Sequence, residues 1–117
     1  MPHILTKTEI DALLKEFCSS LRDYPSLLIR EIILFGSYSR QEADAESDVD
    51  IMILTDLNRD QLSDISKVVL DISDTLFWKY GAVISVHSQN YAFFKEWVSH
   101  LPFYRNVETE GIRYYAA

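Results

Sequence analysis

The longest regular patterns in the chain are two segments whose apolar residues recur every three or four positions. Residues 8–21 carry such a stripe, and Thr6 followed by Glu9 is a capping-box signature at its start. Residues 60–78 repeat the pattern over a longer stretch, and Gly81 follows as a typical helix end. We therefore predict two amphipathic helices, each with one buried face.

Shorter apolar runs lie between and after these two helices. Residues 30–35, 48–54 and 82–88 are rich in the β-branched and apolar side chains of buried strands. Two shorter helices are predicted over 90–98 and 102–110. This order predicts an α/β (α+β) fold with a small mixed β-sheet of three to four strands flanked by helices.

The aromatic-rich segment after residue 101 permits two interpretations. Aromatic residues and arginine dominate the energetics of protein interfaces, so the segment is a candidate partner surface. The alternative, which we favour, is a tail that closes at Gly111 and folds back onto the sheet.

Length and charge narrow the classes of function. The 117 residues have a mass of 13.6 kDa, which fits a single domain over residues 1–117. Lys and Arg number 11 against 18 Asp and Glu, giving a net charge of −7. That balance argues against direct nucleic-acid binding, which needs a basic surface. It does not exclude a nucleotide bridged by a divalent cation, because the cation reverses the local field.

The single cysteine, Cys18, excludes an internal disulfide framework and a four-thiolate zinc site. No apolar run reaches the length of a membrane span, and the first residues lack the pattern of a secretion signal. We therefore expect a cytoplasmic protein without a membrane partner.

The end of the first predicted strand is a candidate phosphate-binding turn. Gly36 has no Cβ and allows close approach of the backbone to a ligand. Ser37 follows it and could open a short helix, whose first N–H groups would suit a phosphate. A glycine-serine pair on its own is weak evidence, because such turns occur in many domains.

Two aspartates at the start of the second strand are a stronger signal. Asp48 and Asp50 are two positions apart, so their side chains share one face of a strand, while Val49, Ile51 and Ile53 face the core. Paired carboxylates repel each other unless a cation lies between them, and Mg²⁺ favours carboxylates together with substrate phosphates. The alternative is a strand start whose acidic side chains are simply in solvent.

Together these residues read G-S-x10-D-x-D with a predicted strand on each side. This pattern resembles the signature of the DNA polymerase-β-like nucleotidyltransferase superfamily. The segment LFGSYSRQEADAESDVDIMIL is most similar to the minimal nucleotidyltransferases (MNT proteins), which consist of this one catalytic domain. The flanking helices and the third strand match the family's order, so the resemblance covers most of the chain.

The resemblance implies Mg²⁺-dependent transfer of a nucleoside monophosphate, most simply AMP from ATP, to a hydroxyl acceptor. Asp48 and Asp50 would be the catalytic metal ligands, and Gly36 and Ser37 would bind the triphosphate. Arg40 falls where the family often has a basic residue. It is therefore either a contact to phosphate or acceptor, or an ordinary solvated arginine.

The third strand departs from the family's pattern. Active members usually carry a third carboxylate there, but residues 82–88 contain no Asp or Glu. Ser85 and His87 share one face of this strand by alternation. His87 is a candidate metal ligand or base, although a lone strand histidine more often has neither role.

Family resemblance also implies a partner. Minimal proteins of this kind are often encoded beside HEPN-domain proteins and act as antitoxins, some by adenylylating a tyrosine of the HEPN toxin. A catalytically weak or inactive module that neutralises its partner by contact is the main alternative. A small-molecule nucleotidyltransferase completed by a dimer or by a second subunit also stays open, as does the oligomeric state.

Overall fold

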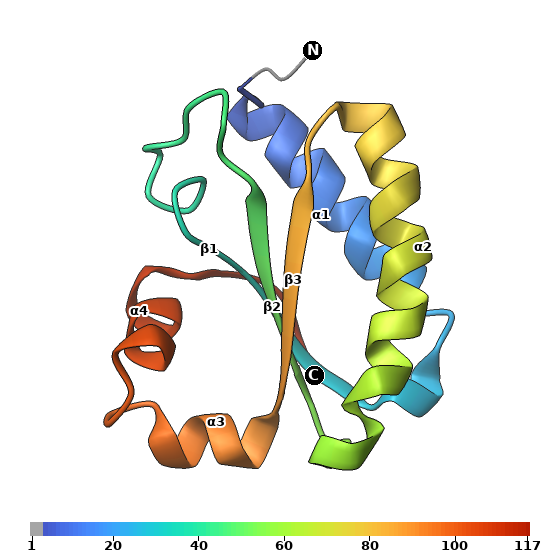
Figure 1. Ribbon diagram of the computed structural model, residues 1–117, viewed down its shortest axis with the longest axis vertical. Coiled ribbons are helices and arrows are strands. Elements are labelled where there is room, and N and C mark those ends of the chain that lie inside the picture. Colours follow the sequence, from blue (N-terminus) through green and yellow to red (C-terminus); the bar gives the residue numbers. More distant parts are fainter. Residues whose placement is uncertain (1–3) are drawn as a thin grey trace.

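The computed structural model describes residues 4–117, which form one β-sheet with helices packed against it (Figure 1). None of the helices in this range is long and apolar enough to cross a membrane. In chain order the elements are α1 (Lys7–Leu21), a 3₁₀ turn (Pro25–Leu27), β1 (Ile29–Phe35), β2 (Val49–Thr55), a second 3₁₀ turn (Arg59–Gln61), α2 (Leu62–Tyr80), β3 (Ile84–Asn90), α3 (Tyr91–Trp97), α4 (Pro102–Glu110) and β4 (Ile112–Ala116).

The four strands form one mixed sheet in the order β3-β2-β1-β4. β1 is antiparallel to both of its neighbours, whereas β2 and β3 are parallel and are joined through α2. Helices α1 and α2 lie on one side of the sheet, and the shorter α3 and α4 lie on the other (Figure 1). The predicted fold class, a small mixed sheet flanked by helices, is confirmed.

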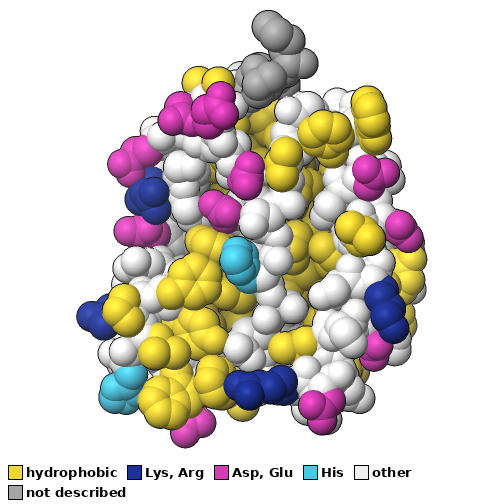
Figure 2. All heavy atoms as spheres, in the orientation of Figure 1, with side chains coloured by type: hydrophobic (Ala, Val, Ile, Leu, Met, Phe, Trp, Pro, Cys, Tyr) yellow, Lys and Arg dark blue, Asp and Glu magenta, His cyan; other side chains and the backbone are white. Residues whose placement is uncertain are grey.

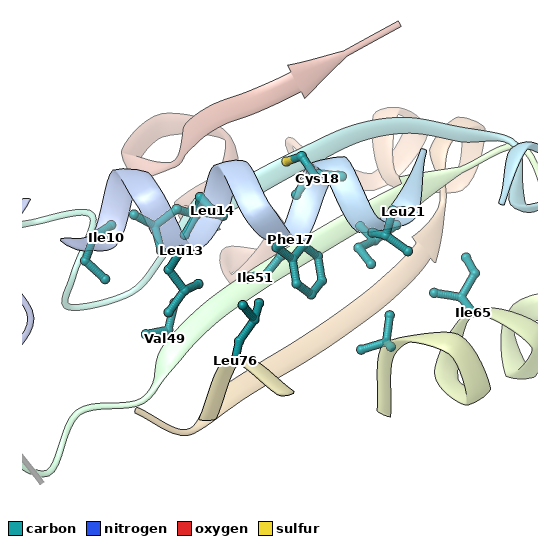
Figure 3. Packing of buried hydrophobic residues seen from close by; sticks show 14 of the residues in the cluster. Ile10, Leu13, Leu14, Phe17, Cys18, Leu21, Val49, Ile51, Ile65 and Leu76 are labelled. Carbon is teal, nitrogen blue, oxygen red and sulfur yellow. The ribbon is translucent and has the colours of Figure 1, made fainter. Parts of the chain in front are cut away.

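Strand alternation divides the core into two layers. Val49, Ile51 and Ile53 of β2 point toward α1 and α2, whereas Met52 and Leu54 point toward α3 and α4. The larger layer is visible in Figure 3, where the apolar stripe of α1 lies over β2 and meets Leu76 of α2. Each fully buried Leu, Ile or Phe stabilises the fold by about 1.5–3 kcal/mol, so this layer fixes the position of β2.

Local capping follows the sequence signals. The Thr6 side chain accepts a hydrogen bond from the N–H of Glu9, whose carboxylate accepts from the N–H of Thr6. Gly81 ends α2 in the left-handed conformation, with φ of +73°. The chain needs two more residues to rejoin the sheet, so β3 begins at Ile84 rather than at the predicted Ala82.

The C-terminal segment supplies a fourth strand that the hydrophobic pattern did not identify as one. β4 pairs with β1, which confirms the interpretation of a tail folded back onto the sheet. An ion pair ties the two strands, because Glu31 of β1 is only 8% exposed and accepts from Nε of Arg113 at 2.6 Å. Lys95 of α3 lies 3.8 Å from the same carboxylate. This link joins the sheet edge to the α3 layer.

Gly111 is where the chain turns from α4 into β4. A Cβ at this position would overlap the carbonyl oxygen of Val107 and the side chain of Ile33. We expect Gly111→Ala to lower the free energy of unfolding by about 1–3 kcal/mol, as overpacking does. Denaturant unfolding would measure the change.

Ala116→Ser is the matched control, because Ala116 lies at the exposed end of β4 and surface substitutions stay within about 0.5 kcal/mol. Equal midpoints for the two variants would show that the close contact at Gly111 is not needed.

Candidate functional site

The centre of the candidate site is a close contact between Gly36 and Asp50. Phe35 pairs with Asp50 across the β1–β2 ladder, so Gly36 leaves β1 directly beside the aspartate. Gly36 has φ of +76°, which side chains rarely adopt. A Cβ there would overlap Oδ2 of Asp50 and lie 3.2 Å from its Cγ. The carboxylate therefore occupies the space that a side chain at position 36 would fill.

After Gly36 the chain makes a single turn rather than the short helix expected at Ser37. The N–H groups of Ser39 and Arg40 donate to the Gly36 carbonyl oxygen at 3.1 and 3.3 Å, and the Ser39 hydroxyl donates to it at 2.7 Å. The N–H of Glu42 donates to the carbonyl oxygen of Ser37 at 2.9 Å, after which the chain leaves the turn. The hydrogen bonds within the turn begin with the N–H of Ser39. Among residues 4–117 the N–H groups of Ser37 and Tyr38 have no acceptor, as is usual for the first N–H groups of a helix.

Asp48 and Asp50 lie together at the start of β2. Asp48 precedes the strand and is exposed, and Asp50 is half-buried within it. Burial raises the pKa of Asp50 above its ordinary value, and the negative charge of Asp48 raises it further. The charges of His87 and Arg40 act in the opposite direction on the same pKa. All three groups therefore lie within electrostatic reach of Asp50.

This donor set fits a divalent cation that takes two protein carboxylates and completes its shell with water and substrate oxygens. A cation between Asp48 and Asp50 would remove both the repulsion and the cost of burying the Asp50 charge. Within residues 4–117, no group of three or more His, Cys, Asp or Glu side chains is arranged to hold a metal ion without substrate. Mg²⁺ suits such an incomplete site, because it retains waters and binds phosphates.

Arg40 is held by two carboxylates rather than extending freely into solvent. Its Nε donates to Glu42 at 2.9 Å, and its Nη1 donates to Glu110 at 3.1 Å. Glu110 is the last residue of α4, so Arg40 joins the turn to that helix. The guanidinium stays close enough to Asp50 to lower the pKa of that carboxyl. The predicted phosphate or acceptor contact therefore stays a prediction, since Arg40 already has partners.

β3 places Ser85 and His87 beside the aspartates, on the side of the sheet that carries α3 and α4. Ser85 is the register partner of Asp50, and His87 is the partner of Met52. Paired residues of parallel strands point to the same face, so Ser85 occupies the position nearest to Asp50. β3 carries no acidic residue, so Ser85 and His87 are the polar side chains that this strand places nearest to the aspartates.

Sequence reasoning missed an aromatic group at the same site. Phe35, His87 and Phe103 form what we term the aromatic platform, with ring centroids 5.5–5.7 Å apart. Phe103 comes from the start of α4 and is 44% exposed. In Figure 2 hydrophobic side chains gather over α3 and α4, whereas acidic side chains gather over the loop between β1 and β2. No sequence signal near Phe103 connects it to β3, because the contact depends on how α4 packs.

This fold and site define a class of protein. A family model for the nucleotidyltransferase domain matches residues 10–107, which is most of the chain. The chain therefore belongs to the nucleotidyltransferase domain family, and it is a nucleotidyltransferase.

Two curated relatives from Methanocaldococcus jannaschii narrow the comparison. The chain is 37% identical over 98 residues to "Putative protein adenylyltransferase MJ0604", covering 84% of this chain and 90% of that protein. It is 35% identical over 77 residues to "Putative protein adenylyltransferase MJ0141", covering 66% of this chain and 76% of that protein.

Solved structures with the same fold come from toxin–antitoxin complexes. A mutant of the toxin–antitoxin MntA-HpeT matches with a TM-score of 0.55 and 18% identity, covering 88% of this chain and 73% of that chain. A toxin–antitoxin structure with AMP-PNP matches with a TM-score of 0.54 and 19% identity over the same shares. At these identities the likeness shows the shared fold.

Gly36→Ala tests the close contact at the site. We expect two effects, a loss of about 1–2 kcal/mol of stability from the left-handed backbone and displacement of the Asp50 carboxylate. Misplacing a metal-binding side chain by about 1 Å is expected to lower the transfer rate roughly 100-fold. Thermal unfolding and the rate of pyrophosphate release would measure the two effects separately.

Gly81→Ala is the matched control, because Gly81 has nearly the same backbone conformation at the end of α2. It should lose comparable stability and keep its rate. Equal loss of rate in both variants would mean that strain, and not the Asp50 contact, explains the effect.

Proposed function

We propose that this protein is a Mg²⁺-dependent nucleotidyltransferase that transfers AMP from ATP to a hydroxyl group of a partner protein. One observation carries the proposal, namely that the half-buried Asp50 carboxylate lies against Gly36 beside Asp48. Such a pair is unfavourable without a cation, and the adjoining turn offers N–H donors to phosphate.

Each residue has a distinct part in the proposed reaction. Asp48 and Asp50 would hold Mg²⁺, which neutralises charge on the triphosphate and on the departing pyrophosphate. The N–H groups of Ser37 and Tyr38 would bind the outer phosphates, with Gly36 permitting their approach. The acceptor oxygen forms a bond to the α-phosphorus as the bond to pyrophosphate breaks, and the hydroxyl proton leaves to solvent or a nearby base. Positioning and electrostatics would supply most of the rate.

The acceptor and partner are proposed from the relatives. Two curated relatives are named as protein adenylyltransferases, which favours a protein acceptor over a small molecule. Two solved structures with this fold are toxin–antitoxin structures, one of them with AMP-PNP. We therefore propose an antitoxin that adenylylates a tyrosine of a HEPN-domain toxin.

The β3 strand favours a second candidate function. Ser85 is the register partner of Asp50 on β3, the strand on which the family resemblance implies a third carboxylate, and this strand has no Asp or Glu. A protein with weak or no transfer activity would still present the same surface to a partner and neutralise it by contact alone.

Asp48→Asn and Asp50→Asn test the chemistry. We expect wild-type protein to label the partner with α-labelled ATP only when Mg²⁺ is present. Each variant should lose at least about 100-fold in rate, because a neutral amide binds Mg²⁺ more weakly than a carboxylate does. Autoradiography of the partner would measure the label. Equal labelling by all three proteins would show that the two carboxylates have no catalytic role.

Suppression of the partner's toxicity distinguishes neutralisation by nucleotide transfer from neutralisation by binding alone. The same two variants are expected to bind the toxin normally but to lose suppression if transfer is the mechanism. Retained suppression by both variants would favour the second candidate function, since contact alone would then suffice.

Ser85→Asp tests whether the missing carboxylate limits activity. The new side chain would lie one strand spacing from Asp50, about 4.8 Å away across the ladder, on the same face. We expect tighter Mg²⁺ binding and a transfer rate about tenfold or more above wild type. Initial rates at several Mg²⁺ concentrations would measure this. Ser88→Asp is the control, because Ser88 pairs with Ile53 and lies on the face of β3 opposite to Asp50. Its folded fraction should keep the wild-type rate.

A further inference from the structure

The aromatic platform lies on the same face of the sheet as the two aspartates. Phe35 pairs with Asp50 across β1 and β2, and its ring contacts both His87 and Phe103. Ser85, the register partner of Asp50, lies two residues before His87 on β3, which places the platform beside the proposed metal ligands. Two of its three rings are accessible, because His87 is exposed and Phe103 is 44% exposed, whereas Phe35 is buried beneath them.

Three features follow one another along this face. The turn after Gly36 lies beyond the end of β1, and Asp50 lies at the start of β2. His87 lies two residues further along β3 than Ser85, the partner of Asp50, which is about 6.6 Å along the strand. The order is thus phosphate-binding turn, carboxylates, aromatic rings. A nucleotide has the same order of parts: outer phosphates, α-phosphate, then ribose and base.

We propose that the aromatic platform binds the base of the nucleotide by stacking, with Phe103 and His87 providing the exposed ring surface. This inference rests on the proposed function, because it takes the triphosphate to lie between the turn and the aspartates. Stacking uses the face that every base offers, so the platform selects by the size of the base more than by its hydrogen-bonding groups.

The rest of the surface argues for this occupant over a second copy of the chain. The loop next to the platform carries Glu42, Asp44 and Glu46, and acidic side chains gather there in Figure 2. A second copy would bring its own acidic loop to the same face. A nucleotide instead brings its negative charge together with Mg²⁺, and its base is neutral.

Calorimetric titration with ATP and with inorganic triphosphate, each with Mg²⁺, tests the inference. Phe103→Leu keeps an apolar side chain but removes the ring. We expect it to weaken ATP binding about fivefold to a hundredfold and to leave triphosphate binding unchanged. Phe103→Trp should retain or tighten ATP binding. UTP should bind wild type more weakly than ATP, and this preference should shrink in Phe103→Leu.

Trp97→Leu is the matched control, because Trp97 is 40% exposed on α3 and contacts Phe93 and His100 rather than the platform. It should bind ATP as wild type does. Equal ATP affinity in Phe103→Leu and Trp97→Leu would overturn the inference. This holds even if Phe103→Leu lowers labelling of the acceptor, because Phe103 would then contact the acceptor and not the base. If wild type bound neither ATP nor triphosphate, the proposed function would fail together with the inference. If wild type bound ATP no more tightly than triphosphate, the inference would fail and the proposed function would stand.

Discussion

The contact between the Asp50 carboxylate and the α-carbon of Gly36 is the constraint on which the site depends. It requires a residue without a side chain in a left-handed conformation, and it requires β1 and β2 to pair in one register. A shift of that register by one residue would turn Asp50 toward α1 and α2. The large apolar layer under α1 holds the register, so the hydrophobic core and the chemistry are not independent.

The acidic pair shows how a stable fold accommodates an unfavourable group. Asp50 is half-buried beside another carboxylate, and its raised pKa records the cost of its charge. The buried carboxylate of Glu31 is stabilised differently, because Arg113 and Lys95 of the same chain neutralise its charge. Of these two carboxylates, Glu31 forms salt bridges with basic side chains and Asp50 forms none with the described residues. A bound cation would give Asp50 the neutralising partner that the chain gives Glu31.

Sequence reasoning reached those features that depend on local geometry. Alternation along β2 separates Asp50 from its apolar neighbours, and the spacing from Gly36 predicts the turn beside it. The partners of Arg40 and the position of Phe103 depend on where α4 packs, which no local pattern encodes. The prediction of a short helix at Ser37 was wrong, because the chain makes only one turn and leaves it after Glu42. β4 was missed as a strand because its exposed, tyrosine-rich residues lack a buried apolar run.

The β1–β2 pairing has a consequence for the order in which the molecule assembles. The glycine and both aspartates lie within one antiparallel hairpin, whereas β1 pairs with β4 through residues about 80 positions later, such as Ala116 opposite Glu31. Closing a short loop loses less entropy than closing a long one, and chains emerge from the ribosome N-terminus first. The turn and the two aspartates, which we propose to bind the nucleotide, can thus take shape while β4 is still being synthesised.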